Sequence, residues 1–140
     1  MSEDPAYEAG MKVRREVLGD EHVDRAIERT TEFTEPFQDY ITRSVWGGIW
    51  TRPGLARPVR SAVTLAVLTA LGREHEIAMH VRAAIRNGLS EAEIGEVLLH
   101  TAAYAGVPAS NAAFAIAQQA LAEARAGGGA PGGSEDPPGS

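Results

Sequence analysis

Three residues of types that could do acid–base and anion-binding chemistry recur at helical spacing: Arg73, Glu76 and His80. Steps of three and four residues place them on one side of a helix that starts near Gly72. Glu76 could orient the imidazole of His80 for general acid catalysis, and Arg73 could hold an anion beside it. Glu–His pairs at this spacing also occur as solvated pairs on helix surfaces. Spacing alone leaves both interpretations open.

The stretch from Tyr40 to Arg73 contains no aspartate or glutamate, although the whole chain carries a formal net charge of −6. Its five cationic side chains are Arg43, Arg52, Arg57, Arg60 and Arg73. A purely cationic stretch in an acidic protein favours an anion site, and arginine can grip carboxylates with two parallel hydrogen bonds. Alternatively, these arginines pair with acidic residues elsewhere in the fold or across an interface.

Composition excludes several classes of protein. The 140-residue chain has no cysteine, which excludes thiol nucleophiles, disulfide redox chemistry and thiolate metal sites. His75 and His80 do not form a metal-binding pair of known spacing, so no metal is predicted. The acidic charge argues against a nucleic-acid partner. No apolar run is long enough for a membrane helix, and the N-terminus lacks a signal pattern, so we expect a cytoplasmic protein.

Hydrophobic periodicity and capping residues predict an all-α fold of about six to seven helices, with no competing strand pattern. The predicted helices span residues 20–29, 34–45, 58–72, 74–87, 90–106 and 110–124. Residues 11–126 are expected to form one domain, preceded by an N-terminal arm at 1–10. Residues 127–140 are nearly all Gly, Pro, Ser and acids, which predicts a disordered tail.

Local patterns also predict which side chains are buried. The helix from Thr34 is expected to bury four apolar residues, namely Phe37, Tyr40, Ile41 and Val45. His100 is expected in the core or at an interface, and His22 facing solvent. Trp46 and Trp50 could fill the core of the monomer or lie at a boundary with another subunit.

Several long segments carry a family resemblance. EVLGDEHV, WGGIWTRPGL, LGREHEIAMHVRA and YAGVPASNAA occur in this order. Together they are similar to the carboxymuconolactone decarboxylase family, within the alkylhydroperoxidase D-like superfamily, from about Gly10 to Ala124. Superfamily members with redox activity carry a CxxCxxxH motif. Its cysteine positions fall here on Arg73 and Glu76 and its histidine on His80, so peroxidase chemistry is not expected.

The resemblance implies a helical homo-oligomer, a trimer or hexamer, in which two subunits complete each site. It also implies loss of CO2 from a dicarboxylate lactone, giving the β-ketoadipate enol-lactone in protocatechuate breakdown. No cofactor is expected, because the lactone itself can accept the electron pair.

The implied reaction, together with the residue pattern described above, assigns roles to these residues. His80, Glu76 and Arg73 are the expected catalytic residues. The expected substrate-binding residues are Arg52, Arg57, Arg60, Trp46 and Trp50. The alternative function is a non-catalytic helical oligomer that binds anionic aromatics or lactones.

Overall fold

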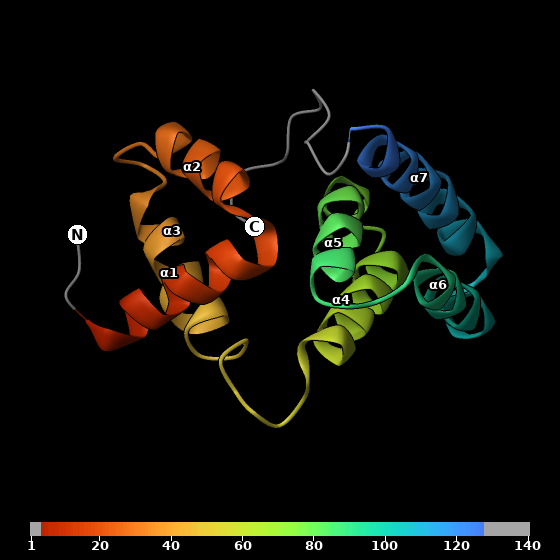
Figure 1. Cartoon of the computed structure of the whole chain (residues 1–140), viewed down its shortest axis with the longest axis horizontal. Coiled ribbons are helices and arrows are strands. Elements are labelled where there is room, and N and C mark those ends of the chain that lie inside the picture. Colours follow the sequence, from red (N-terminus) through yellow and green to blue (C-terminus); the bar gives the residue numbers. More distant parts are fainter. Residues whose placement is uncertain (1–3, 128–140) are drawn as a thin grey trace. The chain divides into compact units, whose positions relative to one another are not determined.

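The computed structural model describes residues 4–127, and every regular element in that range is helical (Figure 1). The elements in chain order are α1 (Pro5–Leu18), α2 (Asp20–Arg29), α3 (Glu35–Tyr40), the π-helix η1 (Ile41–Trp46), α4 (Arg57–Leu71), α5 (Glu74–Arg86), α6 (Glu91–Ala105) and α7 (Val107–Ala126). The predicted all-α fold is confirmed. The predicted tail, apart from Gly127, lies outside the described residues.

The chain forms two compact units, the N-terminal unit ending at Ala56 and the C-terminal unit beginning at Arg57. The sequence predicted a single domain over residues 11–126. In the N-terminal unit α1 packs against α2 and η1. In the C-terminal unit α4 packs on α5 and α6, and α7 packs on α5 and α6. The core of this unit is built around Leu65, Ile77 and Leu98.

The N-terminal unit begins with a helix where the sequence predicted an arm. Asp4 caps α1 by accepting a hydrogen bond from the backbone of Ala6 at 2.8 Å, and Pro5 occupies the first helical position. Residues 5–10 are therefore helical, and Gly10 is buried. A Cβ atom on Gly10 would lie 1.9 Å from the carbonyl oxygen of Thr42, so α1 and η1 meet backbone to backbone.

The π-helix η1 changes which side chains face the interior. The backbone N–H of Gly47 donates to the carbonyl of Thr42 at 2.9 Å, five residues back instead of four. Of the four residues expected to be buried, only Ile41 is; Phe37, Tyr40 and Val45 are exposed. A π-helical turn contains more residues than an α-helical turn, so the spacing of the buried side chains changes. The buried residues of η1 are Ile41, Thr42 and Trp46.

The predicted end of α5 and start of α6 are confirmed, whereas α7 begins at Val107, three residues before the predicted start at Ser110. Ser90 and Glu93 form a reciprocal capping box at the start of α6, with hydrogen bonds of 3.0 and 2.9 Å. Asn87 follows α5, and Gly88 adopts a φ of +106°, a conformation that favours glycine. These local patterns set the boundaries of α5 and α6.

Two histidines lie differently from the sequence prediction. His22 was expected in solvent, but its side chain is 7% exposed because α2 turns it inward beside Val23. His100 is exposed rather than in the core, and its ring lies 5.3 Å from that of Tyr104. A role for His100 at a subunit interface stays a prediction.

Thr69 on α4 is 1% exposed, and no hydrogen-bond partner for its hydroxyl occurs within the described residues. A buried hydroxyl without a partner costs free energy that an apolar side chain of the same shape does not. We expect Thr69→Val to raise the free energy of unfolding by about 1 kcal/mol. Urea denaturation followed by circular dichroism measures this change. A lower stability in the variant would contradict it.

No helix of the described chain is both long and apolar enough to cross a bilayer. Within residues 4–127, no three His, Cys, Asp or Glu side chains are arranged so that they could hold a metal ion.

Candidate active site

The predicted catalytic residues lie directly before α5 and along its first half, and they become more buried from Arg73 to His80. Arg73 precedes α5 and is exposed, Glu76 in the first turn is half-buried, and His80 is 8% exposed. The face formed by these residues is therefore in contact with solvent at Arg73 and buried at His80. A charged group at the outer end and a titratable imidazole at the inner end suit an anionic substrate that receives a proton.

The turn before α5 determines where Arg73 stands. Gly72 has a φ of +70°, which ends α4, and Arg73 is the N-cap with a non-helical backbone at φ −85° and ψ 65°. The sequence prediction placed the helix start near Gly72. Helix α5 begins at Glu74, so Arg73 lies just outside it. The carboxylates of Glu74 and Glu76 in the first turn are favourably placed at the positive end of the helix dipole.

Packing holds the inner end of this face. Ile77 and Val81, which flank His80 on α5, are fully buried in the core of the C-terminal unit. The side chain of Asn87 donates to the hydroxyl of Ser61 at 2.9 Å, which fixes the end of α5 to α4. His80 thus belongs to a rigid part of the fold, as a residue that must present a proton in one geometry requires.

The five arginines of the acid-free stretch separate into two groups. Arg43 and Arg52 belong to the N-terminal unit, and Arg57, Arg60 and Arg73 to the C-terminal unit. Arg57 and Arg60 are half-buried in the first turn of α4, which has no acidic residue there. Arg52 is exposed in the turn that follows Trp50.

Arg43 pairs with acidic residues, as the alternative interpretation of the acid-free stretch predicted. It donates to Asp39 at 2.8 Å and also contacts the carboxylate of Asp4. The hydrogen bond to Asp39 is the main cause that raises the pKa of Arg43 above its usual value.

Trp46 and Trp50 form a contacting pair inside the N-terminal unit. Their ring centroids are 5.2 Å apart with the planes tilted by 33°, and the side chains are 3% and 8% exposed. Both indoles thus contribute to the core of this unit. Their contact with a substrate stays a prediction.

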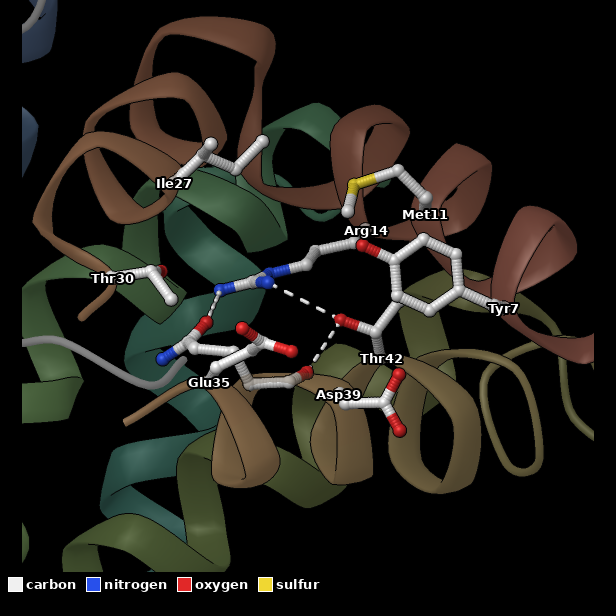
Figure 2. Close-up of a pocket in the computed structure, with 9 residues that line it drawn as sticks. Tyr7, Met11, Arg14, Ile27, Thr30, Glu35, Asp39 and Thr42 are labelled. Atoms are coloured by element: carbon white, nitrogen blue, oxygen red, sulfur yellow. Dashed lines mark hydrogen bonds between the residues drawn. The ribbon is translucent and has the colours of Figure 1, made fainter. Parts of the chain in front are cut away.

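Sequence reasoning missed a pocket in the N-terminal unit (Figure 2). It has a volume of about 570 Å³, and its lining includes Tyr7, Arg14, Ile27, Glu35, Asp39 and Thr42. Arg14 is 1% exposed, and its side chain extends from α1 into the centre of the lining residues. No sequence pattern identified this arginine, since it follows Val13 and precedes Arg15 in a stretch that looks like an ordinary charged helix.

The guanidinium of Arg14 connects α1 to α3 and η1. It donates to the side-chain oxygen of Gln38 at 3.1 Å and to the hydroxyl of Thr42 at 3.4 Å. The Thr42 hydroxyl in turn donates to the carbonyl of Gln38 at 2.8 Å. Burial is the main cause that lowers the pKa of Arg14 below its usual value, although a guanidinium stays charged at neutral pH.

Comparison with known proteins shows the family to which the chain belongs. Residues 35–119 match the carboxymuconolactone decarboxylase family. The chain belongs to this family. The matched range runs from α3 into α7 and contains Arg73, Glu76 and His80, whereas α1 and α2 precede it.

Three relatives show how far the similarity extends. The chain is 50% identical to a 4-carboxymuconolactone decarboxylase of Acinetobacter baylyi over 85% of this chain and 89% of the relative. It is 42% identical to a nitrosuccinic acid decarboxylase of Metarhizium robertsii, over 82% of this chain and 80% of that protein. A 4-carboxymuconolactone decarboxylase sequence from Pseudomonas putida is 53% identical, covering 34% of this chain and 98% of the relative.

Proposed function

We propose that this chain decarboxylates 4-carboxymuconolactone to the β-ketoadipate enol-lactone. The observation that carries the proposal is the 50% identity to the Acinetobacter baylyi enzyme over nearly the full length of both chains. The two relatives that cover most of the chain are both named as decarboxylases. The compounds in their names, carboxymuconolactone and nitrosuccinic acid, each bear two carboxyl groups. Arg73, directly before α5, and His80 on α5 suit such substrates.

The reaction needs no external electron acceptor. The bond between the ring carbon and its carboxylate breaks, and CO2 leaves without the bonding electron pair. That pair moves through the ring double bond onto the lactone carbonyl and gives a furanolate oxyanion. A proton then adds to the carbon next to this carbonyl, which restores the lactone. The protein has to bind the carboxylates, stabilise the oxyanion and deliver one proton.

In this proposal His80 donates the proton or hydrogen-bonds to the oxyanion, and Glu76 orients its imidazole. The burial of His80 supports the assignment, because an acid withdrawn from bulk water stays in a defined position. Arg73, at the exposed end of the face, would bind a substrate carboxylate. Gripping the departing carboxylate equally in substrate and transition state would not accelerate the reaction, so Arg73 is best suited to the acetate arm.

Arg57 and Arg60 are proposed as further carboxylate-binding residues. Their half-buried position at the start of α4 supports this, since partial desolvation strengthens a charge-assisted hydrogen bond. Arg52, Trp46 and Trp50 lie in the N-terminal unit. The role of Arg52 rests on its place in the acid-free stretch, and the roles of the two tryptophans rest on the resemblance.

The direct test is to incubate the protein with 4-carboxymuconolactone and to measure CO2 and enol-lactone together. Nitrosuccinic acid serves as the competing substrate, because the Metarhizium robertsii relative covers most of the chain. We expect a higher kcat/KM for the lactone. Saturable binding of the lactone without CO2 would instead identify a binding module, and preferred turnover of nitrosuccinic acid would assign the second decarboxylase activity.

Removal of the Arg73 side chain by Arg73→Ala should mainly raise KM for the lactone, roughly 10- to 100-fold if a charge-assisted hydrogen bond is lost. Initial rates over a range of lactone concentrations measure this. Arg125→Ala is the matched control, because Arg125 is an exposed arginine of the same unit that pairs with Glu91 at 2.5 Å. Unchanged kinetics in the Arg73 variant would remove this residue from the substrate site.

The proposal includes a homo-oligomer, a trimer or hexamer, in the cytoplasm. Support comes from exposed apolar side chains at every fourth position of α4: Val59, Val63, Val67 and Leu71, each 44–60% exposed. Such a ridge suits packing against another helix. Light scattering of the purified protein tests the oligomer.

A further inference from the structure

We propose that the pocket of the N-terminal unit around Arg14 is a second ligand site, formed by this unit alone, that binds a small aromatic monocarboxylic acid carrying a hydroxyl group. The volume of about 570 Å³ falls within the roughly 300–1,000 Å³ typical of small-molecule sites. Its lining comes from α1, α2, α3 and η1, all within one unit.

Arg14 supplies the recognition of a carboxylate. Its side chain is buried yet lines the open pocket, and its guanidinium is held in place by Gln38 and Thr42. An arginine whose orientation is already fixed loses little side-chain entropy when a ligand binds. A hydrogen bond between a guanidinium and a carboxylate gains strength where water is largely excluded.

The apolar lining accommodates the body of the ligand. Met11 and Ile27 contribute thioether and aliphatic surface, and Tyr7 contributes an aromatic ring. In the view of Figure 2 Ile27 and Met11 lie above the Arg14 side chain and Tyr7 to its right, whereas two carboxylates of the lining lie below it. Sulfur and ring contacts of this kind favour a flat aromatic ligand over an extended aliphatic one.

Two carboxylates in the same lining restrict the charge of the ligand. Glu35 and Asp39 both line the pocket, and Asp39 accepts a hydrogen bond from Arg43 at 2.8 Å. A second negative charge on the ligand would be repelled by these side chains. A hydroxyl group on the ligand could instead donate to one of them. The site therefore selects one carboxylate and a hydrogen-bond donor, unlike the dicarboxylate lactone proposed for α5.

The test is isothermal titration calorimetry of the full chain with 4-hydroxybenzoate, with terephthalate as the dianionic comparison. We expect one saturable site per chain for 4-hydroxybenzoate and at least tenfold weaker binding of terephthalate. Arg14→Met should weaken 4-hydroxybenzoate at least tenfold. Lys12→Met is the matched control, because it removes an exposed cation from the same helix, and it should bind as the original chain does.

A second variant separates recognition from folding, since Arg14 also connects three helices. Ile27→Trp fills the pocket from a side chain that is 47% exposed and leaves the contacts of Arg14 intact. It should retain the helical circular dichroism spectrum and lose the binding. Saturable binding that survives Ile27→Trp, equal binding of terephthalate, or no binding by the original chain would each overturn the proposal.

His80→Ala distinguishes this site from the one on α5. The affinity for 4-hydroxybenzoate should be unchanged in that variant. Loss of binding in His80→Ala would place the ligand at α5 and overturn the second site, while leaving the proposed decarboxylation intact. Conversely, absence of decarboxylation would not affect the titration.

Discussion

Replacing His80 by alanine is expected to lower kcat about 10²- to 10⁴-fold, the range that a well-placed general acid contributes. This corresponds to about 3–5 kcal/mol of transition-state stabilisation. The physical reason is that the furanolate formed after CO2 loss must receive a proton at carbon, and His80 is the buried histidine on the predicted catalytic face. Stopped-flow or steady-state assays of enol-lactone formation measure the effect.

His75→Ala is the matched control for this variant. His75 lies on the same helix five residues earlier, but it is exposed. Its removal deletes an imidazole from α5 without touching the interior, so kcat should stay within about twofold. Because His80 is buried on the same helix as the core residues Ile77 and Val81, the His80 variant also needs an unfolding measurement to show that the C-terminal unit is intact.

The pH dependence of kcat adds a readout that a merely structural histidine would not change. If His80 delivers the proton, kcat falls as pH rises through the range in which the imidazole loses its proton. The residual kcat of His80→Ala should not show this fall with rising pH. A folded His80 variant with the original rate and the original pH profile would exclude the residue from the reaction.

Features that depend on neighbouring residues in the sequence could be predicted. The boundaries of α5 and α6 follow from Asn87–Gly88 and from the Ser90–Glu93 capping box, whose partners are three residues apart or fewer. The common face of Glu76 and His80 follows from helical spacing in the same way. The signal for α1 was also present, since Asp4 before Pro5 is a strong start for a helix, but the terminal position of these residues suggested an arm.

Features that depend on tertiary contacts could not be predicted. Arginine is mostly exposed in proteins and histidine is intermediate in burial, so the burial of Arg14 and His22 becomes evident only when α1, α2 and η1 pack together. The π-turn at Thr42 likewise arises where α1 approaches the backbone of η1 closely. The pocket around Arg14 is a product of these contacts, and no motif marks it.

Gly10→Ala is expected to destabilise the N-terminal unit by about 3 kcal/mol, the upper part of the range for overpacking a close contact. Alanine favours a helix over glycine by about 1 kcal/mol, so propensity alone would predict the opposite sign. The contact decides the outcome. The added Cβ would lie 1.9 Å from the Thr42 carbonyl oxygen and 2.9 Å from the Gly47 nitrogen, and both are backbone atoms that cannot rotate away.

Gly95→Ala on α6 is the control in which propensity should prevail. Gly95 lies inside a helix, and an added Cβ there has no atom within 4 Å. This variant should gain up to about 1 kcal/mol. The two changes can be measured separately, because both tryptophans of the chain, Trp46 and Trp50, belong to the N-terminal unit.

Tryptophan fluorescence therefore follows unfolding of the N-terminal unit, while circular dichroism follows all helices. Gly10→Ala should lower the midpoint of the fluorescence transition in urea, and Gly95→Ala should not lower it. If Gly10→Ala left the fluorescence midpoint unchanged or raised it, α1 and η1 could not be in backbone contact. The π-turn at Thr42 and the pocket that Arg14 enters would then need a different packing of the N-terminal unit, because both are built on that contact.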